Sequence, residues 1–270
     1  MQAPVSQIGE PALGRAPRAA RPPLWHAAEI AAFWVLFLVG LWIIGPRITQ
    51  GGPIIVAYWA LVIPGAALVL WLSPAVLHDD APQLRGWGFF GAPRADPGGL
   101  RQAWPFYAAV TAAGVTAVCA LAAWRDPNLM AHVNARDLAL KFAGYLVWAP
   151  IQALVFFSFM QMRLRGILAG LPGGGERPAV IVLTAAVFSL AHAPNLPLMG
   201  LTLTAGLIWS WLFYSRPNLM LLSLSHATMG ACVHQVLRIS TRIGPFYDRP
   251  DLHLLQNVIP GLKQVFGNLF

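Results

Sequence analysis

The chain alternates between long apolar runs and short polar loops. Seven runs have the length of a membrane helix, at about 28–45, 53–73, 103–124, 139–171, 178–193, 198–214 and 217–237. Crossing the hydrocarbon core takes roughly 20 residues, so each run is predicted to span the membrane once. In the mixed tail, 252–270 is predicted as an amphipathic helix or a short eighth membrane helix. The pattern predicts an all-α, polytopic membrane helical bundle.

The composition supports a surface that faces lipid. Hydrophobic residues make up 57% of the chain and charged residues only 10%, whereas a soluble domain carries about a quarter charged residues. A soluble globular domain is therefore excluded. The 18 Lys and Arg exceed the 10 Asp and Glu, but they lie mainly in loops and flanks. This placement indicates contact with lipid headgroups of the bilayer and no binding of nucleic acid.

The organisation predicted from these runs is one membrane domain between two tails. Residues 1–24 are rich in Arg, Pro and Ala and are predicted to be a disordered basic tail. The first apolar run is long enough to span, so we expect a retained helix rather than a cleaved signal peptide. Residues 25–237 form the transmembrane domain, and 238–270 form the second tail.

The arginine distribution predicts the orientation in the membrane. Arginines of the N-terminal tail, of the loop 74–102 and of the region from Arg163 to Arg177 fall on one side in alternation. The positive-inside rule makes this side cytoplasmic, so the N-terminus is expected in the cytoplasm. The membrane itself is expected to be a bacterial inner membrane. A smaller set favours the opposite orientation: Arg125, Arg136, Arg238 and Arg242.

Polar side chains within the predicted spans are candidates for function, because burying them in lipid is costly. By helix rise, Gln161, His226 and His192 lie about 16, 14 and 22 Å from the turns that begin or end their helices. A modest tilt brings the three side chains to one level. We therefore expect three helices to direct polar groups into one cavity within the membrane.

Three sequence segments around these residues carry a family resemblance. They are Met160-Gln161-Met162-Arg163-Leu164-Arg165-Gly166, Phe188-Ser189-Leu190-Ala191-His192 and His226-Ala227-Thr228-Met229-Gly230. In order and spacing they resemble the motifs of the CPBP family of CAAX prenyl endopeptidase-like and bacteriocin-processing membrane proteases, which are Glu-Glu-x-x-x-Arg followed by Gly, Phe-x-x-x-His and His-x-x-x-Asn. The resemblance covers about 80–235.

The chain departs from the family at the groups that perform chemistry. The resemblance implies that a glutamate activates water while His and Asn position it and stabilise the oxyanion. Here Met160 and Gln161 replace the glutamate pair, and Gly230 replaces the Asn. Glutamine cannot take a proton from water. No acidic residue lies elsewhere near the motifs, and Glu29 stands at the start of the first span. The sequence therefore predicts a degenerate, non-proteolytic homologue.

The family positions also assign roles to individual side chains. His192, His226 and Arg165 occupy positions that are catalytic in the family, although no catalysis is expected from them here. The residues expected to line the substrate or partner cavity are Met160, Gln161, Phe188, Gly230 and His234. Arg163 is predicted to extend to the headgroups, and Arg165 to contact the cavity wall at Gln161 or a backbone carbonyl.

Two functions remain open from the sequence. The first is a membrane scaffold, chaperone or complex subunit that binds lipid, a transmembrane helix or another membrane protein. The alternative is an active CAAX-like intramembrane endopeptidase with a divergent site built on His192 and His226. No cofactor is expected. A metal ion bound by His192 and His226, with His234, is the less favoured alternative, because no carboxylate or thiolate accompanies them.

Overall fold

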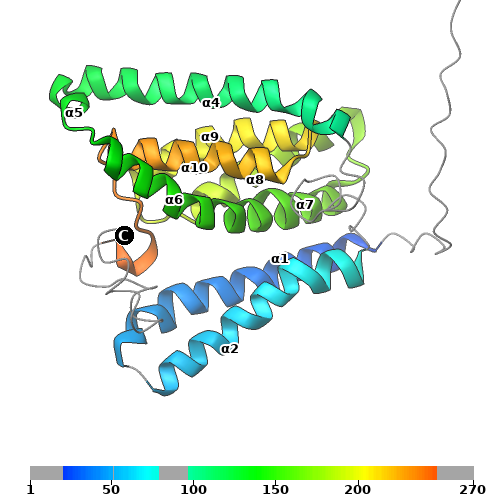
Figure 1. Cartoon of the computed structure of the whole chain (residues 1–270). Coiled ribbons are helices and arrows are strands. Elements are labelled where there is room, and N and C mark those ends of the chain that lie inside the picture. The colour runs from blue at the N-terminus through cyan, green and yellow to red at the C-terminus, as the bar shows by residue number, and fades with distance from the viewer. Residues whose placement is uncertain (1–20, 51, 79–96, 248–270) are drawn as a thin grey trace, which may run out of the picture.

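The computed structural model describes residues 21–50, 52–78 and 97–247 (Figure 1). Within these ranges the chain is helical and contains no strand, which confirms the predicted all-α class. The predicted basic tail up to residue 20, most of the loop 74–102 and the possible helix at 252–270 lie outside the described residues.

The N-terminal part forms a hairpin of two long helices. Segments labelled η are 3-10 or π-helical stretches that continue or join the α-helices. The hairpin consists of α1 (Pro23–Leu38), η1 (Val39–Ile44), η2 (Gly45–Gln50), α2 (Pro53–Ala67) and η3 (Leu68–Leu77). Proline at the first turn of α1 and of α2 suits a position whose N–H needs no helical partner. Gly52 joins the two helices with a φ of 52°, a conformation that glycine adopts without strain.

The remaining described residues form the main bundle. Its elements are α4 (Pro97–Arg125), α5 (Pro127–Ala131), α6 (Ala135–Gln152), η4 (Ala153–Met160), α7 (Gln161–Leu168), η5 (Pro172–Gly174), α8 (Glu176–Leu190), α9 (Leu196–Ser215), α10 (Leu219–Gln235) and η6 (Gly244–Phe246). Asn134, Asn195 and Asn218 cap α6, α9 and α10, because their side chains accept backbone N–H groups of the first turn.

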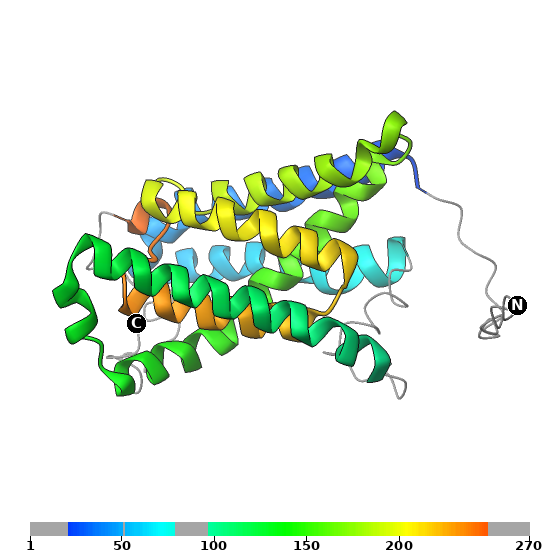
Figure 2. The same ribbon diagram turned by 90° about the horizontal axis from the view of Figure 1, so that it is seen from above.

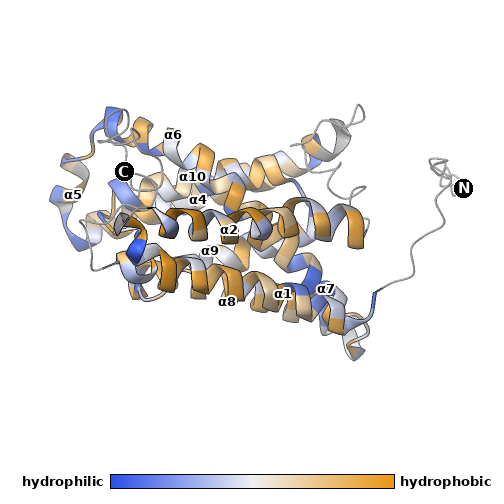
Figure 3. Ribbon diagram, turned by 90° about the horizontal axis from the view of Figure 1, so that it is seen from below, coloured by the Kyte–Doolittle hydropathy of each residue, from blue (hydrophilic) through white to orange (hydrophobic). Residues whose placement is uncertain are grey.

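The hairpin packs as a separate layer against the bundle (Figure 1). It meets the bundle mainly through α1 against α7 and η3 against η4, while α4 runs along the opposite side (Figures 1 and 2). The helices are apolar along most of their length, and hydrophilic residues gather towards their ends, including the region of α7 (Figure 3). The contact between α1 and α7 therefore includes polar residues, whereas the helices are apolar along most of their length.

Five helices of the described part are long and apolar enough to cross a membrane. They are Pro23–Ile48, Pro53–Pro74, Leu100–Arg125, Ala135–Leu168 and Leu196–Ser215. The other two predicted spans correspond to α8 and α10, which are helical but only 15 and 17 residues long. These two are shorter than the roughly 20 residues of a typical span. The protein is therefore a multi-pass membrane protein, and its side-to-side orientation stays a prediction.

Candidate functional site

The two motif histidines contact the same aromatic side chain, that of Phe188. His192 follows α8, and its Nδ1 lies 2.7 Å from the carbonyl oxygen of Phe188 one turn earlier. The ring of Phe188 lies 4.9 Å from the ring of His192 and 5.6 Å from the ring of His226 on α10, both edge to face. The structure thus brings together His192, His226 and Phe188, as their spacing in the sequence suggested.

Gln161 lies next to this contact through helix α9. Its side chain is 1% exposed, and its Nε2 donates a hydrogen bond of 3.0 Å to the carbonyl oxygen of Ser210. The preceding residue, Trp209, places its ring 4.8 Å from the ring of His226. Met160 points elsewhere, into a cluster of apolar side chains that includes Phe33. Gln161 and the histidines are therefore neighbours, whereas Met160 belongs to the packing.

The histidines are enclosed by aromatic side chains. The ring of Phe157 lies 5.2 Å from that of Phe188 and 6.2 Å from that of Trp209, and Phe156 adds a further edge contact to Phe188. All four aromatic residues are at most 5% exposed, and His192 and His226 are each 6% exposed. The motif region is consequently a packed interior in which the imidazoles contact rings rather than charged groups.

The position of the family asparagine is filled by another side chain. A Cβ atom at Gly230 would lie 2.6 Å from Cε1 of Tyr145, which packs across from α6. Contacts this close do not occur in folded proteins without a shift of the neighbour. The glycine therefore allows Tyr145 to occupy the space that an asparagine side chain would need.

His234 and Arg165 lie away from this centre. His234 is two turns, about 12 Å of helix rise, beyond His226. Arg165 is 41% exposed, stacks its guanidinium 4.5 Å from the ring centre of Tyr214 and lies 4.0 Å from Oε1 of Glu176. These partners differ from the expected contact with Gln161. Within the described ranges, no three His, Cys, Asp or Glu side chains are grouped to hold a metal ion.

Arg163 corrects one prediction. It was expected to extend to the headgroups, but its side chain is 2% exposed, and its Nε lies 3.4 Å from Oε2 of Glu29. A charge taken out of water needs a partner of opposite sign, and Glu29 on α1 supplies it. The expectation that no carboxylate lies near the first motif was therefore wrong.

Glu29 is the centre of a buried polar cluster that the sequence analysis missed. We call Glu29, Ser73, His78, Arg163 and His26 the Glu29 cluster. Ser73 donates to Oε2 of Glu29, and Nε2 of His78 lies 2.5 Å from Oε1. The imidazole of His26 stacks on that of His78 with ring centres 4.5 Å apart. The sequence does contain signs of this cluster. His26 and Glu29 lie three residues apart on one predicted span, and Arg163 lies within another.

The Glu29 cluster and the motif histidines lie on different faces of α7. Side chains two positions apart on a helix point about 200° apart, so Arg163 and Gln161 face opposite ways. Arg163 faces α1, and Gln161 faces α9. Both oxygens of Glu29 are already engaged by cluster members. Glu29 therefore does not replace the missing glutamates beside the histidines.

These observations define a class of protein: a multi-pass helical membrane protein with three motif segments on α7, α8 and α10. Residues 134–232 match the family model described as type II CAAX prenyl endopeptidase Rce1-like. The match runs from the cap of α6 into α10 and supports the resemblance seen in the sequence, so this part of the chain is similar to CAAX protease-like membrane proteins. The searches of curated proteins and of solved structures gave no match.

Proposed function

We propose that this protein is a non-proteolytic CAAX protease-like protein that acts by binding a lipid or a partner helix within the membrane, as a scaffold, chaperone or complex subunit. The observation that carries the proposal is that two motif positions, Gln161 and Gly230, take part in contacts that pack the helices together. Gln161 is engaged with the backbone of Ser210, and Tyr145 fills the space beside Gly230. Both groups that hydrolysis would need are replaced by contacts that hold the fold.

The chemical argument concerns the proton of the attacking water. A general base contributes roughly 10²–10⁴ to a hydrolytic rate, and one oxyanion donor contributes roughly 10²–10³. The amide of Gln161 supplies no base, and Gly230 supplies no side-chain donor. The histidines are enclosed by rings of Phe157, Phe188 and Trp209, which are at most 4% exposed. This environment disfavours hydrolysis at the histidines.

The test restores the family groups in two stages and assays cleavage. CAAX-like peptides and a generic transmembrane substrate are incubated with the purified protein, with Met160→Glu/Gln161→Glu, and with that pair combined with Gly230→Asn and Tyr145→Ala. Tyr145→Ala is included because the ring blocks the asparagine. We expect no cleavage by the unmodified protein and measurable cleavage only in the four-fold variant.

The control is the four-fold variant with His192→Ala, which should lose any restored activity. Cleavage by the unmodified protein that disappears in His192→Ala would refute the proposal. That outcome would favour the alternative of an active endopeptidase that uses His192 and His226.

A further inference from the structure

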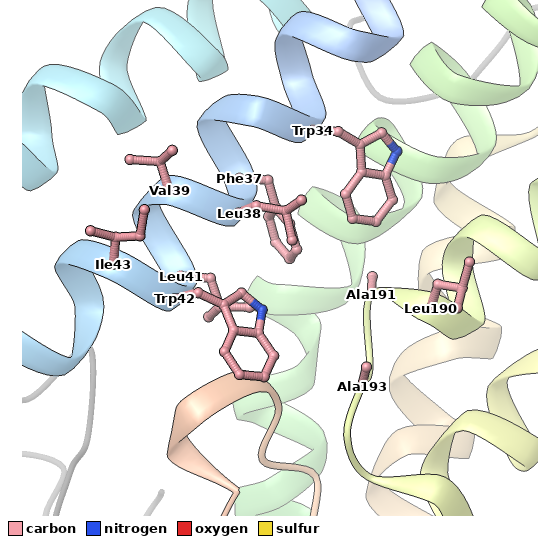
Figure 4. Close-up of a pocket in the computed structure, with 10 residues that line it drawn as sticks. All are labelled: Trp34, Phe37, Leu38, Val39, Leu41, Trp42, Ile43, Leu190, Ala191 and Ala193. Atoms are coloured by element: carbon pink, nitrogen blue, oxygen red, sulfur yellow. The ribbon is translucent and has the colours of Figure 1, made fainter.

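An apolar groove opens on the lipid-facing side of the protein beside His192 (Figure 4). It has a volume of about 490 Å³ and lies between the second half of the first span and the end of α8. The residues that line it are all apolar and include Trp34, Phe37, Leu41, Trp42, Leu190 and Ala193. Trp42 and Leu190 are 44% and 58% exposed. The groove is therefore open towards the hydrocarbon of the membrane.

We propose that this groove binds one acyl chain of an anionic phospholipid, whose phosphate is held by Arg47 at the end of the groove. The inference rests on the proposed function, because it names the ligand class of the binding role. A volume of this size lies within the range of pockets that hold small molecules.

The size of the groove favours a single acyl chain over a helix. One turn of an α-helix is about 5.4 Å long and 10–12 Å across, so it alone takes roughly 400–600 Å³. A membrane-spanning helix is several turns long, so a groove of about 490 Å³ would take up only a small part of it. A flexible hydrocarbon chain can instead lie along its length and contact both walls.

The charge at the end of the groove favours an anionic headgroup. Arg47 is exposed and lies one turn after Ile43, which lines the groove. Its guanidinium bends back and donates to the carbonyl oxygen of Ile43, so the charge sits beside the groove. Arginine binds phosphate oxygens through charge-assisted hydrogen bonds. The sequence segments 30–78 and 177–247 contain no Asp or Glu that would repel a phosphate.

The wall of the groove opposite α1 is fixed before any ligand binds. The carbonyl oxygen of Ala193 accepts a 2.7 Å hydrogen bond from the backbone N–H of Gly244, and Nδ2 of Asn195 donates to the carbonyl oxygen of Ser240. Phe246 packs against Leu41 on the other wall. The chain after α10 therefore ties the two walls together, which reduces the ordering cost of binding.

The experiment counts the phospholipids that remain bound after purification in mild detergent, by native mass spectrometry of the full chain. Leu190→Trp fills the groove from its rim. Its matched control is Val182→Trp, which adds the same side chain at a site on α8 that is 52% exposed and outside the groove. Arg47→Gln removes the headgroup contact. Its control is Arg101→Gln, an exposed arginine of α4. Helix α4 runs along the side of the bundle opposite the hairpin (Figure 1).

We expect the unmodified protein to retain one phospholipid, enriched in phosphatidylglycerol over phosphatidylethanolamine relative to the membrane. Leu190→Trp should lower its occupancy at least tenfold, and Val182→Trp should leave it unchanged. Arg47→Gln should lower the preference for the anionic phospholipid roughly tenfold, which is the effect expected from losing one charge-assisted hydrogen bond. Arg101→Gln should leave this preference unchanged. Thermal melting of each variant near that of the unmodified protein confirms that the fold is kept.

Three results would overturn the lipid site: equal lipid retention in Leu190→Trp and Val182→Trp, retention without an anionic preference, or a peptide or the chain's own segment 252–270 cross-linked in the groove instead. The two proposals fail in different ways. Cleavage of a CAAX-like peptide by the unmodified protein refutes the proposed function and leaves the lipid count unchanged. Equal lipid counts refute the lipid site without any cleavage.

Discussion

The two faces of α7 handle polar groups in opposite ways. On the face towards α1, Arg163 and Glu29 form an ion pair within the Glu29 cluster. On the face towards α9, Gln161 is neutral and bonds to a backbone carbonyl beside two histidines held against aromatic rings. A single eight-residue helix thus separates a charged, paired interior from an uncharged, aromatic one.

The difference shows how one short membrane helix can hold a buried charge on one face and only neutral polar groups on the other. Charge within the bilayer persists where partners compensate it. In the Glu29 cluster, the carboxylate has partners in η3, at the residue that follows η3 and in α7, and these contacts join the hairpin to the bundle. At the motif face the acidic residues are absent, and the remaining imidazoles serve as packing groups. The first motif therefore contributes to docking through Arg163 and to the surroundings of the motif histidines through Gln161.

The largest effect is expected from breaking the ion pair. Arg163→Met leaves the carboxylate of Glu29 buried without its arginine, which should lower the free energy of unfolding by about 3–5 kcal/mol. Arg165→Met, two residues away and 41% exposed, should cost at most about 1 kcal/mol. Unfolding in detergent, followed by circular dichroism, measures both.

A second variant checks that the loss comes from the uncompensated carboxylate. Glu29→Gln combined with Arg163→Met should recover part of the stability lost in Arg163→Met alone, because no buried charge then lacks its partner. Similar losses for Arg163→Met and Arg165→Met would show that the two faces of α7 do not differ as described.

An intermediate effect is expected where the hairpin touches α7. A Cβ atom at Gly166 would overlap the imidazole of His26, so Gly166→Ala should cost about 1–3 kcal/mol. Gly144→Ala on α6 is the matched control, because nothing lies within 4 Å of its Cβ position. That change should be neutral or stabilise by up to about 1 kcal/mol. Thermal unfolding compares the pair, and equal effects would argue against close docking of α1 on α7.

The smallest effect is expected on the aromatic face. Nδ1 of His226 has no hydrogen-bond partner in the described part of the chain, so His226→Leu removes a buried polar group that is not compensated there. The free energy of unfolding should change by no more than about 1 kcal/mol. A loss as large as that of Arg163→Met would contradict the view of this face as uncharged packing.

The helical framework could be predicted from the sequence because its signals are local. Apolar runs bounded by Pro and Gly placed the helices, although α8 and α10 are shorter than a typical membrane span. The contact of His192 and His226 with Phe188 follows from the order of the motifs and from the short turns between their helices. These features depend on helix period and loop length, which a single sequence displays.

The contacts that escaped prediction join residues far apart in the chain. Arg163 lies two positions from Gln161, so its opposite direction could be read from the helix period, but its partner Glu29 could not. Burial of the pair depends on how the hairpin docks. Tyr145 likewise reaches Gly230 only after α6 and α10 pack together. The sequence shows only that Gly230 lacks the side chain of an asparagine. The structure shows that this leaves room for the ring of Tyr145.

The position of the Glu29 partners bears on how the protein is assembled during synthesis. Ser73 and His78 belong to the same hairpin as Glu29, 44 and 49 residues further along the chain, whereas Arg163 is made much later. The hairpin can therefore enter the bilayer with its carboxylate already hydrogen-bonded. The arrival of Arg163 then adds the opposite charge and locks the finished hairpin against the later helices. Glu29 can thus bond first within the hairpin and later join the hairpin to the helices that are made after it.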